Sequence, residues 1–139
     1  MKVSVVCPIY NEEKFIARCI ETMLAQDFPN SEMELLFVDG MSKDRTREIV
    51  AEYAGQYENI HLLDNPQKIV PYALNAGIQV AKGEYIVRID GHCSYPVNYI
   101  STLIHWAEKL HADNVGAMLN TLPANDKPEC QAVAIVMSH

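Results

Sequence analysis

Apolar residues are distributed along this chain in two alternating patterns. Mostly apolar runs, typical of strands covered on both faces of a sheet, occupy residues 3–7, 34–38, 60–63 and 85–89. Between these runs, apolar residues recur at helical spacing, which predicts helices from the residues after Asn11 to Leu24 and over 45–57, 71–81 and 98–110. A last apolar run, residues 115–119, predicts a fifth strand.

Residues with known preferences for helix and strand ends mark the predicted boundaries. Pro8 is expected to end the first strand, and Asn11 to cap the first helix. Asp44 is a candidate cap for the second helix, and Gly83 follows the third helix in the position that glycine favours. These signals agree with the boundaries that the apolar pattern suggests.

The alternation of strands and helices predicts an α/β fold, a Rossmann-like and mostly parallel sheet with helices on both faces. Such sheets bind ligands at the carboxyl ends of their strands. Polar segments follow the first, second and fourth strands, at residues 10–12, 39–44 and 90–92. The sequence therefore predicts a ligand site at one edge of the sheet.

The first two polar segments offer groups that suit a nucleoside. The ring of Tyr10 could stack on a base, or it could simply pack, whereas Asn11 is better explained as a helix cap. Asp39 follows a buried strand directly and could accept a ring N–H such as N3 of uracil; the alternative is a turn in which Asp39 bonds its own backbone. Gly40 would let a ligand approach the backbone closely.

The third polar segment offers groups that suit a metal ion. If the fourth strand continues past residue 89, Asp90 and His92 share one face and could bind one divalent cation. An imidazole ligand favours manganese over magnesium. A purely structural role for this short motif is the alternative.

Lys68 precedes the third helix and could contact phosphate or remain solvated.

Composition narrows the classes of protein that remain. The 139 residues suit one domain, and 49% hydrophobic and 21% charged residues are ordinary for a globular protein. A net charge of −7 with interspersed signs argues against nucleic acid as a partner. No run of apolar residues is long enough to predict a membrane span. The four scattered cysteines are expected to be reduced thiols, which favours a cytoplasmic location.

Four segments together resemble the inverting family 2 glycosyltransferases, which have the GT-A fold. In chain order these segments are residues 5–13, 37–46, 73–77 and 83–90. The chain departs from the family pattern at Gly40 and at His92, where aspartates are usual. Asp90-x-His92-Cys93 followed by Tyr95-Pro96 is similar to a subgroup that builds bacterial exopolysaccharides of the succinoglycan type.

The resemblance implies a donor site for a nucleotide-diphospho-sugar, with UDP favoured. By position in the motifs, the implied nucleotide-binding residues are Pro8, Tyr10, Glu12, Asp39, Lys68 and Asp90. Asp90 and His92 would hold Mn²⁺ or Mg²⁺. The implied acceptor is a glycan or a lipid-linked sugar. The implied location is cytoplasmic, and for the full-length protein it extends to the cytoplasmic face of the inner membrane.

Direct displacement at the anomeric carbon also needs a general base to deprotonate the acceptor. Four carboxylates follow His92 in the chain, at Glu108, Asp113, Asp126 and Glu129. None of them matches the base motif of the family, so the catalytic residue is left unassigned. We therefore expect residues 1–139 to be the nucleotide-sugar-binding, N-terminal part of a longer enzyme, truncated before its acceptor region and inactive by itself.

Two alternatives share the fold. A non-catalytic nucleotide-binding module would keep the site without transferring a sugar. A nucleotidyltransferase would need a glycine-rich phosphate loop after the first strand, and Tyr10 to Glu13 contains no glycine.

Overall fold

A computed structural model of the protein describes residues 1–118, 120–123 and 126–137. Its strands form one parallel sheet in the order β3-β2-β1-β4. The strands are β1 (Val3–Ile9), β2 (Met33–Asp39), β3 (Ile60–Asp64) and β4 (Tyr85–Arg88). The predicted α/β fold with a parallel sheet is confirmed.

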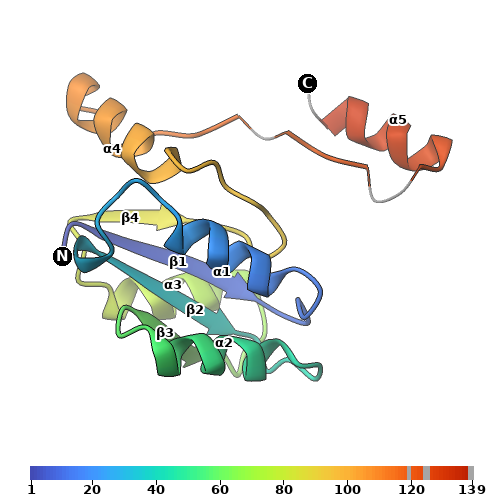
Figure 1. The fold of residues 1–139 in the computed structure, drawn as a ribbon, viewed down its shortest axis with the longest axis horizontal. Helices are drawn as coiled ribbons and strands as arrows, with labels where there is room; N and C mark the ends of the chain where they lie inside the picture. The colour runs from blue at the N-terminus through green and yellow to red at the C-terminus, as the bar shows by residue number, and fades with distance from the viewer. Residues whose placement is uncertain (119, 124–125, 138–139) are drawn as a thin grey trace. The chain divides into compact units, whose positions relative to one another are not determined.

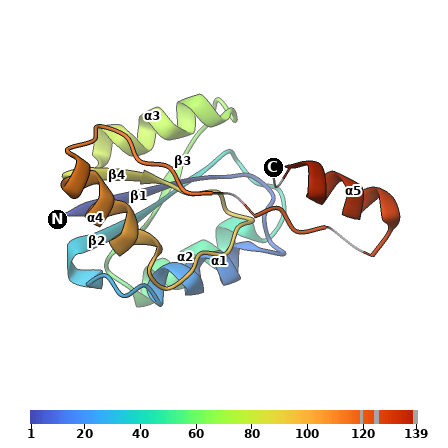
Figure 2. The ribbon, with the colours of Figure 1, turned by 90° about the horizontal axis from the view of Figure 1, so that it is seen from above.

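Helices cover both faces of this sheet, as predicted (Figure 1). The helices of the described residues are α1 (Ile16–Leu24), α2 (Thr46–Gln56), α3 (Val70–Val80), α4 (Tyr99–Leu110) and α5 (Pro128–Met137), with a short 3₁₀ turn at Asn30–Glu32. Figure 2 shows α1 and α2 on one side of the sheet and α3 on the other.

The central strand β1 alternates between two apolar layers. Val5 and Cys7 belong to the larger core beneath α1, to which Ile100 of α4 also contributes. Val6 points to the opposite layer and packs beneath α3. Gly77 permits this close approach, because an added Cβ there would lie 2.5 Å from Cγ1 of Val6. Because successive side chains of β1 point to opposite faces, the strand contributes to a core layer on each side of the sheet.

A buried carboxylate lies at the amino end of the sheet. Glu34 is 1% exposed and accepts hydrogen bonds from the Ser4 hydroxyl (2.5 Å) and the Lys82 N–H (2.7 Å). The Gly83 N–H in turn donates to Oγ of Ser4 (2.8 Å). These donors offset the desolvation of a buried charge, so the cluster ties the turn before β4 to β1 and β2.

Two details of the predicted strands are wrong. Pro8 lies within β1 and pairs with Val38. It is tolerated because β4 pairs with β1 only as far as Val6, so at Pro8 the strand is paired on one side alone, as an edge strand is. Residues 115–118 form no strand, because no neighbouring strand pairs with them in the described part of the chain, and Met118 is 96% exposed. Leu119, the last residue of that prediction, lies outside the described residues.

The chain divides into two compact units, Met1–His105 and Trp106–His139. The first contains the sheet, α1 to α3 and the start of α4. In the second, the Lys109 ammonium lies 4.6 Å from the centre of the Trp106 ring. Glu129 lies in the first turn of α5. Within the described ranges no helix is long and apolar enough to cross a membrane.

Candidate functional site

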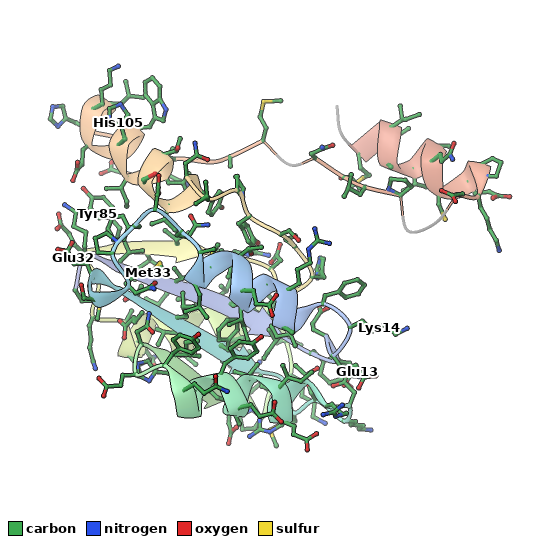
Figure 3. All side chains as sticks on the ribbon, viewed as in Figure 1. Glu13, Lys14, Glu32, Met33, Tyr85 and His105 are labelled. Carbon is green, nitrogen blue, oxygen red and sulfur yellow. The ribbon has the colours of Figure 1, made fainter. Side chains whose placement is uncertain are left out.

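The loops that follow the strands meet at the carboxyl edge of the sheet. We call residues 10–15 the first loop, 40–45 the second, 65–69 the third and 89–98 the fourth, in the order of the strands they follow. In Figure 3, Glu13 and Lys14 of the first loop lie at the end of the sheet opposite to Met33 and Tyr85. Parallel pairing of all the strands gathers the predicted ligand residues at this edge.

Hydrogen bonds join the first loop to the segment that begins α2. The Asn11 N–H donates to Oγ of Ser42 (2.9 Å), and the Glu12 N–H donates to Oγ1 of Thr46 (2.7 Å). In the opposite direction, the Lys43 N–H donates to Oδ1 of Asn11 (2.9 Å). The backbones of two loops that are distant in sequence are therefore fixed against each other.

The prediction that Asn11 caps the first helix is wrong. Its side chain bonds Lys43 in the second loop, its φ is 54°, and α1 begins only at Ile16 after a turn closed by the Phe15 N–H on the Glu12 carbonyl. Nothing in a single sequence distinguishes a cap from this longer-range bond, because both need the same short amide side chain.

Asp44 was expected to cap the second helix, but α2 begins at Thr46 with Arg45 in the capping position, so Asp44 lies one residue before the cap and joins the start of α2 to the first loop. Its carboxylate accepts the N–H of Thr46 (3.0 Å) and the N–H of Glu13 (3.2 Å). Desolvation raises the pKa of Asp44, but the hydrogen bonds from Thr46 and Glu13 outweigh it and leave the pKa below its ordinary value. The folded loops thus favour the charged carboxylate.

Asp39 is fully buried at the end of β2, with its side chain 0% exposed. Oδ1 accepts the Ser42 hydroxyl (2.5 Å), while Oδ2 accepts the Ser42 N–H (3.0 Å) and the Arg47 guanidinium (2.7 Å). The bond to the Ser42 N–H is the turn that the sequence offered as an alternative. Whether Asp39 also contacts a nucleobase stays a prediction.

Arg47 is a residue of the site that the sequence reasoning missed. Its guanidinium bonds Asp39 and also Oδ1 of Asp64 (2.8 Å) at the end of β3. These hydrogen bonds, to Asp39 and then to Asp64, raise the pKa of Arg47. The available signal was its place in the first turn of a predicted helix, beside two strand ends that carry aspartates.

Two of the predicted residues, Tyr10 and Lys68, approach Gly40. A Cβ at this position would lie 3.4 Å from Cδ2 of Tyr10 and 3.5 Å from the carbonyl oxygen of Lys68. Tyr10 is 47% exposed, so part of its ring is open to a ligand. Buried Asn65 holds the third loop, since its N–H donates to the Asp39 carbonyl (2.8 Å) and its amide donates to Ile69 (3.0 Å).

The segment around Asp90 and His92 is a turn, so the condition under which these two side chains would share one face of a continuing strand is not met. β4 ends at Arg88, and the Cys93 N–H donates to the Asp90 carbonyl (3.1 Å). The Asp90 carboxylate bonds Arg88 (3.2 Å), and Nδ1 of His92 lies 3.0 Å from Oε1 of Glu12. The Asp90 N–H donates to the Tyr95 hydroxyl (2.8 Å). This hydrogen bond takes the place of one to a neighbouring strand, so the backbone can turn here.

The fourth loop is anchored by buried groups to α1 and to the residues that follow it. The Gln26 amide donates to the Pro96 carbonyl (2.8 Å) and accepts the Ile100 N–H (3.0 Å). Cys19 is buried below the turn and its thiol donates to the Asp90 carbonyl (3.7 Å). Burial raises the pKa of the Tyr95 hydroxyl and of the Cys93 thiol. These contacts hold the Asp90 backbone in place.

The donor atoms of this turn fit a divalent ion in their chemistry. Asp90 and His92 have side chains that are 46% and 58% exposed, so a carboxylate oxygen and an imidazole can both be reached. Within the described ranges, no group of three or more His, Cys, Asp or Glu side chains is arranged to hold a metal. An ion here would need its other ligands from a diphosphate or water.

Comparison with known proteins assigns the chain to a family. The model of the family described as "Glycosyl transferase family 2" matches residues 4–123. The chain belongs to this family. The resemblance drawn from the four motif segments is therefore confirmed, and the Asp90–His92 turn and the loops around Tyr10 lie at the carboxyl edge of the sheet of a family 2 domain.

Individual proteins agree with this assignment. The chain is 32% identical over 120 residues to the "Succinoglycan biosynthesis protein ExoA" of Rhizobium meliloti, covering 85% of this chain and 36% of that protein. A structure of S. aureus TarS 1–349 in complex with UDP-GlcNAc gives a TM-score of 0.72 at 24% identity, covering 87% of this chain and 38% of the other.

A mannosyltransferase from Pyrobaculum calidifontis, in complex with GDP-Man and Mn²⁺, also gives a TM-score of 0.72, at 23% identity, over 95% of this chain and 38% of that one. These structural likenesses show the GT-A fold. The chain spans less than half the length of the curated relatives that it matches.

Proposed function

We propose that this chain binds a UDP-sugar at the carboxyl edge of its sheet. We further propose that the whole protein transfers the sugar, with inversion, to a glycan or lipid-linked acceptor. The observation that carries the proposal is the convergence of Tyr10, Gly40 and Lys68 at one point of this edge in a family 2 domain. The complex of TarS with UDP-GlcNAc supports the choice of donor.

The nucleoside would lie between the first and third loops. The half-exposed ring of Tyr10 would stack on uracil, and Asp39 would accept the N3–H of the base. Asp39 is buried, so the base would reach it only after a small movement of the loops around it. Pro8 and Glu12, at the end of β1 and in the first loop, would line the site.

The diphosphate would extend toward the exposed Lys68 and the Asp90–His92 turn. Asp90 and His92 would hold a divalent ion, Mn²⁺ or Mg²⁺, which supplies charge neutralisation of the leaving diphosphate. The Mn²⁺ in the Pyrobaculum calidifontis structure and the mixed oxygen and nitrogen donors of this turn support Mn²⁺. Glu12, bonded to His92, would orient the imidazole.

For the whole protein we propose a role in building a polysaccharide in a bacterium, at the cytoplasmic face of the membrane. The likeness to the succinoglycan protein ExoA supports this role. The general base that deprotonates the acceptor is not assigned to a residue of this chain, so the proposal for the chain itself concerns donor binding.

The test is calorimetric titration of the chain with UDP, with and without Mn²⁺. We expect binding that strengthens with Mn²⁺ and that loses this metal dependence in Asp90→Ala. Asp39→Ala should weaken binding whether or not metal is present. Glu84→Ala is the control, because this exposed acid precedes β4 at the amino edge and pairs with Lys2. Absence of UDP binding under both conditions would contradict the proposal.

A further inference from the structure

Two aspartates share one arginine at the ligand edge of the sheet. Asp39 and Asp64 are register partners at the ends of the neighbouring strands β2 and β3. The Arg47 guanidinium lies between them, 2.7 Å from Oδ2 of Asp39 and 2.8 Å from Oδ1 of Asp64. The exposed Asp64 carboxylate thus holds the cation that pairs with the buried Asp39 carboxylate.

The two oxygens of Asp39 face different neighbours. Oδ2 takes two donors, the Arg47 guanidinium and the Ser42 N–H, whereas Oδ1 takes the Ser42 hydroxyl alone. The Ser42 oxygen also accepts the Asn11 N–H, so Oδ1 is linked to the first loop, next to Tyr10. A carboxylate has about four lone-pair sites, which leaves one for a further donor, on Oδ1.

We infer that Arg47 and Asp64 are positioning residues for nucleobase selection. Together they hold the Asp39 carboxylate in one orientation, in which its free acceptor site lies on Oδ1, the oxygen linked to the first loop. A fixed acceptor there favours a base that presents a ring N–H, as uracil does at N3. It disfavours cytosine, whose N3 is itself an acceptor. The inference rests on the proposed UDP site and deepens it.

The arginine is suited to this role because its planar fork bonds two carboxylates at once. When the loops move to admit a base, the bond to Arg47 keeps Oδ2 occupied, so Asp39 cannot rotate to exchange its two oxygens. Without Arg47, the carboxylate would be free to turn or to bond Ser42 differently. Uracil would then lose its fixed acceptor, whereas cytosine would lose only a repulsive contact.

A purely structural role makes a different prediction. If Arg47 only joined α2 to the ends of β2 and β3, its loss would loosen the whole site. Binding of UDP and CDP would then weaken by the same factor. The ratio of the two affinities therefore separates positioning of Asp39 from general support of the fold.

The experiment measures dissociation constants of UDP and CDP by calorimetry in Mn²⁺, for the whole chain and its variants. The wild type should prefer UDP. Arg47→Met should weaken UDP binding about tenfold, the scale expected for a lost charge-assisted hydrogen bond, and change CDP binding by less than about threefold. Arg45→Met is the matched control, because that exposed neighbour bonds Glu48 (3.0 Å) and should leave both constants unchanged.

Two milder variants carry the test if Arg47→Met does not fold, as judged by circular dichroism. Arg47→Lys keeps a charge but cannot bond both carboxylates, so it should restore part of the UDP preference. Asp64→Asn frees one end of Arg47 and should reduce the preference in the same direction.

Three outcomes count against the inference. Equal losses for UDP and CDP in the Arg47 and Asp64 variants would overturn it while the UDP site stands. A wild type that binds UDP and CDP equally would overturn it as well. A wild type that binds neither would remove the proposed function, and the inference with it.

Discussion

Individual side chains at the ligand edge differ in how much of each is open to a ligand. Tyr10 keeps about half of its surface exposed, whereas the Asp39 carboxylate is wholly covered and already has three donors. A stacking contact with Tyr10 therefore needs no rearrangement, and a hydrogen bond to Asp39 does. We expect the two residues to affect nucleotide binding in different ways.

Tyr10→Ala should weaken UDP binding about tenfold or more, since loss of a base–aromatic stack costs about 1–3 kcal/mol. Tyr10→Phe keeps the ring and should bind UDP as the wild type does. Calorimetry checks both, with Tyr72→Ala as control, because Tyr72 is similarly exposed (52%) on α3. Equal binding by Tyr10→Ala and the wild type would show that the ring packs against Gly40 without contacting a base.

Asp44 should contribute stability that depends on pH. Its pKa is below its ordinary value of 3.8 because hydrogen bonds from Thr46 and Glu13 outweigh desolvation. A depressed folded pKa gives stability that is present above the unfolded value and lost as the pH falls through the folded value. This contribution should therefore be complete at pH 7 and disappear below about pH 3.8.

The variant Asp44→Asn tests this dependence by urea unfolding. Its free energy of unfolding should be about 0.5–1 kcal/mol lower than the wild type's at pH 7, because N–H groups bond a neutral amide oxygen less strongly than a carboxylate. The difference should shrink as the pH drops below 3.8. Asp113→Asn, at an exposed position, should match the wild type throughout. A difference that is constant with pH would mean that the charge of Asp44 does not matter.

At the scale of elements, the strands of the parallel sheet followed from the sequence because each is a mostly apolar run; β2 is buried on both faces, and even the partly exposed edge strand β4 keeps such a run. The runs at 34–38 and 85–89 lie within one residue of β2 and β4 at each end. The run at 115–119 had the same apolar character, but a strand also needs a neighbour to pair with, and a local pattern cannot show whether one exists.

The bonds between loops were harder to foresee. Ser42, Thr46 and Arg47 hold the site together, yet each contacts residues far away in sequence. Helix-cap rules consider only neighbours along the chain, so Asn11 was assigned to the nearest helix. The ligand edge could be located from strand ends, but the partners of each side chain there depend on tertiary placement.

Gly83 shows how an element boundary can depend on a single missing side chain. A Cβ at this position would clash with the backbone of Val3 and Ser4, which cannot yield as a flexible side chain would. We expect Gly83→Ala to lower the free energy of unfolding by about 2 kcal/mol or more, in the range of overpacking at buried sites.

The matched control for Gly83→Ala is Gly55→Ala in α2, where an added Cβ meets nothing within 4 Å. That variant should be more stable than the wild type by about 0.5–1 kcal/mol, because alanine favours helix. Urea unfolding measures both. Similar effects of the two substitutions would contradict the tight contact between the turn at Gly83 and β1.

At the scale of the whole molecule, the apolar core is concentrated in the first unit. Among the described residues, Ala134 is the one buried apolar side chain that lies beyond residue 105. The loops of the proposed donor site also belong to this unit. Folding and donor binding should therefore both persist when the residues after α4 are removed.

A chain of residues 1–112, which retains all of α4, tests this expectation. Its melting temperature should lie within about 4 °C of the full chain's, a difference of roughly 1 kcal/mol for a domain of this size. Its UDP affinity in Mn²⁺ should change by less than about twofold. A chain of residues 1–98 is the comparison: it lacks Ile100 and Ile104, which are 0% and 7% exposed. Losing these two side chains should cost about 3 kcal/mol or more. If residues 1–112 melted as early as residues 1–98, the segment after α4 would be part of the core that supports the site.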